Sequence, residues 1–511
     1  MTAGAQAASR AGTRGFVDVL GAFGPAHGTA GTAGASLESL VAEREAHGIR
    51  LTLASSLLAI SADGSTGNRL AIEAAADPAN GLAAIAVIGA RRTGDAARRV
   101  DEAQLAGAVG FRLDGWDAAG PPSEAISEVL RAMARAGRPL LVPIERSGAA
   151  SVIGAATARL GIPVVLLGAH YSHIVDDLAA ASRYPHLYLE TSAMAHFRAI
   201  ETAVRTIGHE RVVFGTGSPA SAAASPIGAI LASAIPPEAK QAILGGNAVR
   251  LFGLPDGPIE LTPLDGPARA FDVHTHLGPL DFDVPQVADG ALLDALQFGQ
   301  AVVASAALAI FGDPVRGNDQ AVRAAAAHGA AGLRAYVVAD PTDLASTDEQ
   351  LRRHLDAPGV VGVKVHGEWS GTPTASRAMA ELFELLARFG RPVKIHNAGG
   401  GWDAALGAIA DRHPGLPIVI AHGGLGTPSV EGARLAASHD NVYLEFSSSF
   451  AHLPTLREAV AIAGPDRLLW GSDAPLLDPA FVLGTYRDAG LLSPDLADRV
   501  FWTNAATLFE W

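Results

Sequence analysis

Short apolar runs alternate with longer amphipathic stretches along most of the chain. Runs such as IVIA at residues 418–421 contain no polar residue, which suits strands that are buried on both faces. Stretches such as residues 375–389 suit helices. This alternation predicts parallel βα units and a closed (β/α)8 barrel, with a doubly wound open sheet as the alternative. No Gly-x-Gly-x-x-Gly turn or Walker-type loop is present, which counts against nucleotide-binding folds.

The chain contains an internal repeat, and its offset of about 250 residues is close to the size of one TIM-type barrel. LASSLLAI at residues 53–60 corresponds to VASAALAI at residues 303–310. Further matches follow in the same order: Asp18 with Asp272, Arg138 with Arg391, Glu190 with Glu445, Pro219 with Pro475, and Asn247 with Asn504. We therefore expect two tandem (β/α)8 TIM-type barrels, residues 1–252 and 268–511, joined by a linker rich in Pro, Gly and Asp at residues 253–267.

Composition narrows the possible partners. Hydrophobic residues make up 49% of the chain and charged residues 18%, as in packed globular proteins. The net charge of −14 argues against binding to nucleic acid or to an anionic membrane. No apolar run approaches the roughly 18 residues of a membrane span, and the first residues lack a signal-peptide core, so we expect a cytoplasmic protein. Because the chain has no cysteine, any metal must be held by His, Asp, Glu or a modified Lys.

Candidate chemistry is concentrated in the second copy, where polar residues stand at the predicted strand ends. The first strand reads FDVHTH, and its alternation points His274 and His276 the same way. Later strand ends carry Lys364, His366, Lys394, His396, His422 and Asp473. In a barrel these ends converge. Imidazole and carboxylate ligands with one open position are what a hydrolytic metal site needs, because a bound metal lowers the pKa of water towards 7.

These motifs carry a family resemblance over residues 271–509. The segments that carry it include GVKVH (362–366), PVKIH (392–396), AHGG (421–424), NVYL (441–444) and GSD (471–473). The second copy resembles the amidohydrolase superfamily, in the branch of aminocarboxymuconate-semialdehyde decarboxylase, resorcylate-type decarboxylases and dicarboxylate lactonases. The resemblance implies that His274, His276, His396 and Asp473 bind one divalent metal. It also implies that His422 polarises the substrate or acts as an acid or base. Zinc suits such ligands, and manganese or iron would also be accommodated.

Three positions leave alternatives open. Lys394 stands where an apolar residue is usual in this branch, so it binds a substrate carboxylate or forms an ion pair with Glu445. Lys364 is a possible bridging ligand, because some relatives carboxylate a lysine on the fourth strand to hold two metals. His366 is either a substrate contact or a structural histidine. Glu368 and Trp369 are assigned to the following loop, without chemistry.

The first copy lacks every predicted ligand, so we interpret it as a degenerate barrel. The counterparts of His274, His276, His396, His422 and Asp473 are Leu20, Ala22, Pro143, Gly168 and Gly217. Groups that both copies share are interpreted as scaffold, which argues against a catalytic role for Glu445 and Ser447. His170 and His173 could form a new site, although ordinary loop histidines are favoured because no further ligand accompanies them in the pattern. The tandem arrangement suggests an intramolecular pseudo-dimer, and the chain could also form a homo-oligomer.

The sequence thus predicts a metal-dependent hydrolase that acts on a small carboxylate-bearing molecule. Metal-activated water would attack a lactone, amide or related bond, and Asp473 would have a catalytic role besides holding the metal, because it would take up the proton of that water. Non-oxidative decarboxylation is the first alternative, since it uses the same ligands, and a non-catalytic binding scaffold is the second.

Overall fold

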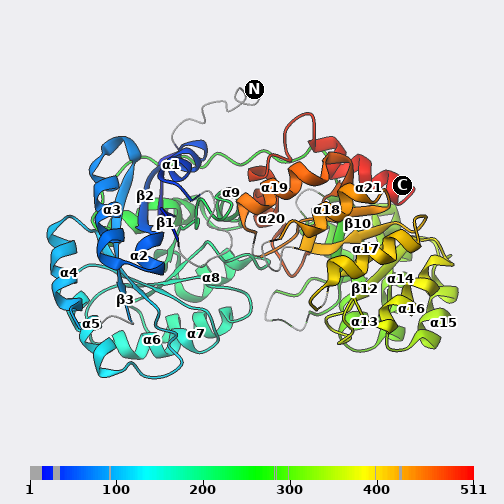
Figure 1. Cartoon of the computed structure of the whole chain (residues 1–511), viewed down its shortest axis with the longest axis horizontal. Helices are drawn as coiled ribbons and strands as arrows, with labels where there is room; N and C mark the ends of the chain where they lie inside the picture. Colours follow the sequence, from blue (N-terminus) through cyan, green and yellow to red (C-terminus); the bar gives the residue numbers. More distant parts are fainter. Residues whose placement is uncertain are drawn as a thin grey trace. The chain divides into compact units, whose positions relative to one another are not determined.

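The computed structural model describes residues 14–26, 35–90, 94–280, 282, 285–296, 299–397, 399–424, 429–449 and 451–511. The chain divides into two compact units, residues 1–264 and residues 265–511. In each unit the strands lie inside a ring of helices (Figure 1). Each unit is built from strands and helices that alternate along the chain.

The N-terminal unit contains an eight-stranded parallel sheet whose strands are hydrogen-bonded in sequence order. The strands are β1 (Phe16–Phe23), β2 (Ile49–Ser56), β3 (Leu82–Gly89), β4 (Gly110–Asp114), β5 (Leu140–Pro143), β6 (Val164–Leu167), β7 (Leu187–Glu190) and β8 (Val212–Val213). A parallel bridge between Gly21 and Ser218 joins β1 to the segment after β8. This bridge brings the two ends of the sheet together, as a barrel requires.

Amphipathic helices cover these strands. They are α1 (Leu37–Ala46), α2 (Leu57–Ser61), α3 (Gly64–Ala76), α4 (Ala96–Leu105), α5 (Glu124–Arg135), α6 (Ala149–Thr157), α7 (Ile174–Arg183), α8 (Ala199–Ile207), α9 (Ala224–Ala232), α10 (Pro237–Gln241) and α11 (Asn247–Phe252). Helix α5 shows how the sequence sets them. Ser123 caps its N-terminus by accepting from the Ile126 N–H, and its buried face carries Val129, Leu130 and Met133.

The C-terminal unit repeats this topology. Its strands are β9 (Ala270–Leu277), β10 (Gly299–Ala306), β11 (Leu333–Ala339), β12 (Val360–His366), β13 (Val393–His396), β14 (Ile418–Ile420), β15 (Val442–Glu445) and β16 (Leu468–Leu469). They are parallel, lie in sequence order, and close through a bridge between Thr275 and Ala474. The prediction of two tandem (β/α)8 barrels is confirmed, and the open-sheet alternative is wrong.

The helices of this unit follow the same plan. They are α12 (Leu292–Ala295), α13 (Ala307–Phe311), α14 (Pro314–His328), α15 (Leu344–His354), α16 (Arg377–Ala387), α17 (Trp402–Arg412), α18 (Glu431–Ser438), α19 (Leu453–Ala463), α20 (Pro479–Asp488) and α21 (Asn504–Leu508). An apolar core cluster gathers strand residues such as Val273, Tyr336 and Val419 with Phe509.

The sequence repeat corresponds to a shared hydrogen-bond framework. In the first unit the Asp18 carboxylate accepts from the Thr216 N–H (3.0 Å), and in the second the Asp272 carboxylate accepts from the Ser472 N–H (3.1 Å). Both aspartates are buried, and each ties the first strand to the segment after the eighth. In both units the register between the first and second strands shifts twice along their length.

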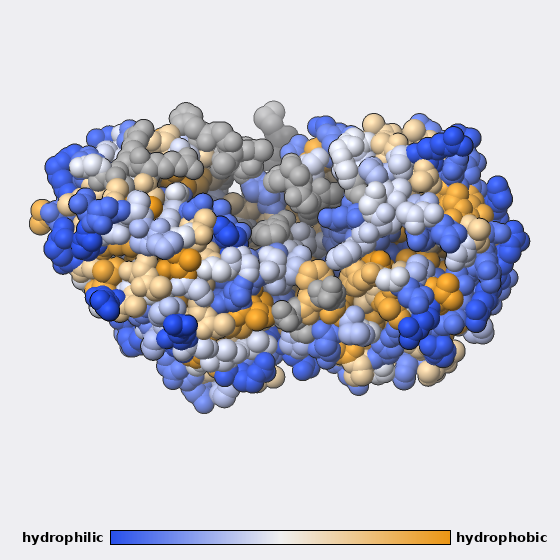
Figure 2. Space-filling view, turned by 90° about the horizontal axis from the view of Figure 1, so that it is seen from below, coloured by the Kyte–Doolittle hydropathy of each residue, from blue (hydrophilic) through white to orange (hydrophobic). Residues whose placement is uncertain are grey.

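The surface is mostly hydrophilic on the face shown in Figure 2, where hydrophobic residues form small separate groups. No helix in the described part of the chain has the length and apolarity needed to cross a membrane.

Candidate metal centre

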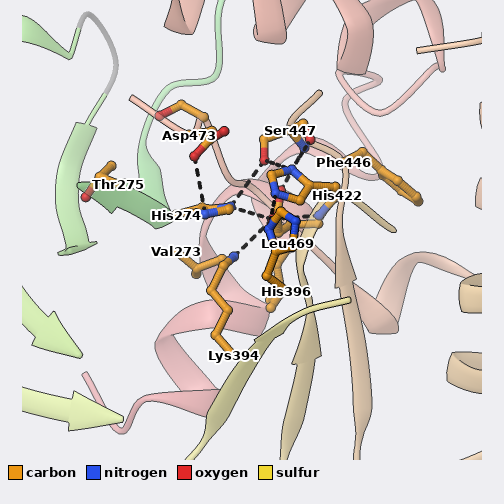
Figure 3. Close-up of polar contacts among 12 residues, drawn as sticks. Val273, His274, Thr275, Lys394, His396, His422, Phe446, Ser447, Leu469 and Asp473 are labelled. Carbon is orange, nitrogen blue, oxygen red and sulfur yellow. Dashed lines mark hydrogen bonds and ion pairs between the residues drawn. The ribbon is translucent and has the colours of Figure 1, made fainter. Parts of the chain in front are cut away.

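Three of the predicted ligands converge at the C-terminal end of the second barrel. His276 Nε2 lies 2.9 Å from Asp473 Oδ1. His274 Nε2 lies 3.3 Å from the same oxygen (Figure 3). One ligand atom from each of these residues lies within 4.8 Å of the others, and all three side chains are buried. This group could hold a metal ion, and its nitrogen and carboxylate donors suit a divalent transition metal.

Each of the two histidines has a polar partner at its second ring nitrogen, Nδ1. His274 Nδ1 donates to Glu445 Oε1 at 2.7 Å, and the Ser305 hydroxyl lies 3.2 Å from His276 Nδ1. Their Nε2 atoms therefore face Asp473. Outer-shell partners on the second ring nitrogen are the usual way in which proteins orient a metal-binding histidine.

The electrostatics give each group the protonation state that a metal needs. Burial lowers the pKa of His274 well below its ordinary value, and the nearby charges of Lys394 and Lys364 lower it further. Burial also lowers the pKa of His276. Burial alone would raise the pKa of Asp473, but the imidazoles of His274 and His276 bring it below its ordinary value. A metal ion binds imidazole in its neutral form and carboxylate in its ionised form, so these shifts favour the forms that bind metal.

Glu445 is the main functional residue that sequence reasoning missed. Its carboxylate is wholly buried and accepts from His274 Nδ1, Lys394 Nζ (3.0 Å) and the His422 N–H (3.0 Å). Its counterpart Glu190 has a narrower role, because its carboxylate accepts from the hydroxyl of Ser192 at 2.8 Å. Sharing a residue between the two copies therefore did not mean sharing its whole role.

The contacts that only Glu445 makes follow from its neighbours. In the first barrel, the positions of His274 and Lys394 are taken by Leu20 and Leu141, which offer no donor side chain. Ser447, which the repeat also assigned to the scaffold, places its hydroxyl 3.3 Å from His274 Nδ1 and 3.2 Å from His422 Nδ1. Both shared residues thus contact the candidate centre.

His396 lies between His422 and Glu368. Its Nδ1 lies 3.1 Å from His422 Nε2, and its Nε2 lies 2.9 Å from the Glu368 carboxylate. Among the described residues it joins neither of the metal-competent groups around His274. Glu368, which was assigned no chemistry, thus holds the far nitrogen of His396. The sequence could not show this contact, because Glu368 lies on the loop after β12 and reaches across to the end of β13.

A second group that could hold a metal consists of His274, His422 and Glu445. His422 Nδ1 donates to the Ser447 carbonyl at 2.7 Å, because a carbonyl oxygen can only accept. The Nε2 atom of His422 is therefore the one on which a proton can be exchanged, and it faces His396.

The strand register explains how four further side chains come together. Lys364 on β12 is paired with Lys394 on β13, and His366 is paired with His396. The two imidazole rings stack at a centroid distance of 3.9 Å. Burial lowers the pKa of Lys364 to about 7, and the neighbouring charge of Lys394 adds to the effect. Lys364 Nζ lies 3.3 Å from His274 Nε2, so the candidate bridging lysine does lie beside the centre.

The expectation that Lys394 binds substrate conflicts with its position. Its side chain is 0% exposed, and its Nζ lies 3.0 Å from Glu445 Oε1. A buried cation that is paired with a buried carboxylate is held inside the barrel and does not face an incoming molecule. The alternative stated from the sequence, an ion pair with Glu445, is the arrangement observed.

Two residues of the centre have backbone conformations that favour glycine. His422 has a φ of 59° and Asp473 a φ of 61°. In the first barrel the same positions are Gly168 (φ 86°) and Gly217 (φ 70°). The two turns are thus shared, but at these two positions only the second barrel has residues with side chains. Such placement costs about 1–2 kcal/mol for a non-glycine residue and is characteristic of functional sites.

A cavity of about 180 Å³ lies beside His366, between α13 and the ends of β11 and β12. Its wall includes His366, Phe311 and Trp369, and the two aromatic rings meet edge to face at 4.6 Å. The polar part of the wall includes Asp340 and Thr342.

A known protein family matches both halves of the chain. The profile of the family described as Amidohydrolase matches residues 32–254 and again residues 271–511. The chain belongs to the amidohydrolase family. Membership confirms the family and the class of metal-dependent enzyme, hydrolase or carboxy-lyase, that the sequence predicted. The two separate matches also confirm that the amidohydrolase barrel occurs twice.

Solved structures similar to the amidohydrolase chain include three decarboxylases. A 2,6-dihydroxybenzoate decarboxylase from Rhizobium is 17% identical, with a TM-score of 0.38, over 47% of this chain and 98% of its own. A 5-carboxyvanillate decarboxylase from Sphingomonas paucimobilis is 16% identical, with a TM-score of 0.38, over 47% and 99%. A dihydroxybenzoic acid decarboxylase from Polaromonas with bound manganese is 16% identical, with a TM-score of 0.36, over 47% and 97%. No curated protein matches the sequence.

Proposed function

We propose that the C-terminal barrel is a divalent-metal-dependent hydrolase that cleaves a lactone, amide or related bond in a small carboxylate-bearing substrate. The observation that carries the proposal is the convergence of His274 Nε2 and His276 Nε2 on the Asp473 carboxylate, at 3.3 and 2.9 Å. When bound, the metal supplies Lewis acidity and lowers the pKa of water at the site. His274, His276 and Asp473 would hold it, and Glu445 and Ser305 keep the two imidazoles in position.

His422 is the proposed acid or base. Its Nδ1 is committed to the Ser447 carbonyl, so its Nε2 can take up or release one proton without rotation of the ring. His396 and Glu368 continue this line of contacts towards the surface, since Glu368 is exposed. Protons could therefore pass between His422 and solvent along this path.

The cavity suggests how substrate is held. Neither lysine nor arginine belongs to the described residues that line it, and Lys394 is sequestered by Glu445. A substrate carboxylate would therefore find its countercharge at the metal centre and not in the cavity wall. The Phe311–Trp369 pair offers a hydrophobic surface suited to a flat ring. This wall favours a second candidate function, non-oxidative decarboxylation of an aromatic acid, which uses the same ligands.

Metal content tests the centre itself. We would measure it by inductively coupled plasma mass spectrometry in the wild type and in a His274→Ala/His276→Ala variant, after incubation with zinc or manganese. A difference of one equivalent per chain between the two proteins supports a mononuclear site, and a difference of two supports bridging by a modified Lys364. A His439→Ala variant serves as the control and should keep the wild-type content. If wild type and double variant hold the same amount, the proposal is refuted.

Product analysis separates the two reactions. The metal-loaded protein would be incubated with a panel of lactones and aromatic acids in water labelled with oxygen-18. Label in a newly formed carboxylate marks hydrolysis, and release of carbon dioxide marks decarboxylation. The product that the wild type forms should be absent when the His422→Ala variant is assayed. A product that persists in that variant would remove His422 from the proposed mechanism.

A further inference from the structure

The cavity beside His366 has a wall that is partly acidic and partly aromatic. Asp340 brings a carboxylate to it, and Phe311 and Trp369 bring two aromatic rings. Neither lysine nor arginine is among the lining residues that the structure describes. The cavity therefore carries a negative group that no positive side chain of its own wall balances.

The carboxylate of Asp340 is held in place with one oxygen left over. Its Oδ1 accepts from the N–H and the hydroxyl of Thr342, at 2.8 and 2.7 Å. Its backbone is fixed as well, because the Thr347 hydroxyl on α15 accepts from its N–H and donates to its carbonyl, both at 3.0 Å. Within the described part of the chain, no hydrogen bond or ion pair reaches its Oδ2. An ionised carboxylate accepts on both oxygens, so Oδ2 is available to a donor from outside.

The aromatic part of the wall attracts the same kind of group. Phe311 ends α13 and Trp369 lies in the loop after β12, and their ring centroids are 4.6 Å apart. Trp369 keeps 49% of its surface exposed, so its ring is open to contact. The faces of aromatic rings attract cations, and such rings are a common means of recognising organic ammonium ions. The carboxylate and the rings thus favour the same ligand, a cation that also has hydrogen-bond donors.

The repeat shows that this wall is particular to the second barrel. Asn68 and Asn318 align the two copies here, because each amide oxygen accepts from the N–H of a valine on the third strand, at 2.8 Å. The counterparts of Phe311, Asp340 and Trp369 in the first copy are Ser61, Gly89 and Asp117. The aromatic pair and the acidic group therefore occur together only in the copy that has the candidate metal centre.

Strand β12 connects the cavity with that centre. Lys364 Nζ lies 3.3 Å from His274 Nε2, and His366, two residues further along the strand, lines the cavity. Two residues of a strand span about 6–7 Å. A small molecule can therefore reach from the cavity to the centre.

We propose that this cavity binds a protonated amine, and that the substrate of the C-terminal barrel is a small zwitterion. Its ammonium group would donate to Asp340 and contact the rings of Phe311 and Trp369, while its carboxylate would face the metal centre. The assignment of the amine to the substrate rests on the function proposed above, whereas amine binding by the cavity does not require the metal. Asp340 would then discriminate against acids whose far end is neutral or negative, because they leave its carboxylate without a donor cation.

Two probes of nearly the same shape test the cavity in the full-length protein. Benzylamine is a cation at neutral pH, and benzyl alcohol is not. Titrations followed by saturation-transfer NMR should show benzylamine binding about tenfold more tightly, the usual effect of one charge-assisted hydrogen bond. Asp340→Asn should remove this preference. The control Asp343→Asn changes the same charge at an exposed helix cap outside the cavity wall and should keep it.

The proposal is overturned if the wild type binds both probes equally, or if folded Asp340→Asn still prefers benzylamine. The wild-type comparison needs no variant, so it remains decisive even if Asp340→Asn does not fold.

A third probe separates this proposal from the proposed function. The preference for benzylamine should persist in the His274→Ala/His276→Ala variant, because the amine does not contact the metal. In the metal-loaded wild type, 4-(aminomethyl)benzoate should bind about tenfold more tightly than benzylamine, and this gain should vanish in the double variant. If the carboxylate adds nothing in the metal-loaded protein, the zwitterionic substrate is refuted although the amine site stands. Equal metal content in wild type and double variant would instead refute the metal centre and leave the benzylamine result unchanged.

Discussion

The left-handed conformation of His422 leads to a prediction in which the usual ranking of alanine and glycine is reversed. At φ 59° a residue with a Cβ is strained by about 1–2 kcal/mol relative to glycine. Glycine loses more backbone entropy on folding, about 0.5–1 kcal/mol relative to alanine. Both His422→Gly and His422→Ala remove the same imidazole and its contact with the Ser447 carbonyl. The difference between them is therefore backbone strain, and the glycine variant should be the more stable by about 0.5–1 kcal/mol.

Urea unfolding followed by tryptophan fluorescence measures this difference in the relevant barrel. Five of the six tryptophans, Trp369, Trp402, Trp470, Trp502 and Trp511, belong to the C-terminal unit. The control is Ala408→Gly, at an exposed position within α17, where glycine should destabilise by about 1 kcal/mol. Both His422 variants should lose turnover. If His422→Ala proved as stable as His422→Gly, or more stable, backbone strain would not distinguish this turn from the turn at Gly168 in the first barrel.

Four further predictions follow from the geometry. Glu445→Gln should weaken metal affinity by about 10–100-fold, because it weakens the hydrogen bond that orients His274. The matched Glu190→Gln should leave metal affinity unchanged, and equal effects of the two substitutions in a titration with zinc would contradict this. Lys394→Met leaves Glu445 as an unpaired buried charge and should lower the free energy of unfolding by about 3–5 kcal/mol, measured in urea; a selective rise in KM at unchanged stability would restore its substrate-binding role. Burial raises the pKa of Glu190 to about 7, so this carboxyl binds a proton more tightly in the folded protein than in the unfolded chain. The stability of the N-terminal barrel should therefore fall as pH rises from 5 to 8. Urea titrations measure it, and a Glu190→Gln variant whose free energy of unfolding fell as steeply with pH as that of the wild type would disprove this. Trp369→Ala should raise KM for an aromatic substrate about tenfold with a smaller change in kcat, because about 1–1.5 kcal/mol of aromatic contact is lost; steady-state kinetics would show an unchanged KM if the cavity is not the substrate site.

Local patterns in the sequence were sufficient for the architecture. Apolar runs at the spacing of βα units predicted both barrels, and the repeat predicted that they are copies. The period of two along a strand placed His274 and His276 on the same side, which holds for any sheet. The loss of ligands from the first copy was also visible, since Leu20 and Gly217 cannot bind a metal through their side chains.

The tertiary structure decided which polar groups meet. The closed sheet brings Lys394 on β13 to Glu445 on β15 and places His396 between His422 and Glu368, and no sequence spacing encodes these distances. Glu445 was set aside because the first copy keeps it, yet its added contacts depend on partners that only the second copy has. Periodicity is a property of one strand or helix, whereas a site depends on the packing of several, so the sequence alone determined the fold and the structure determined the chemistry of its ends.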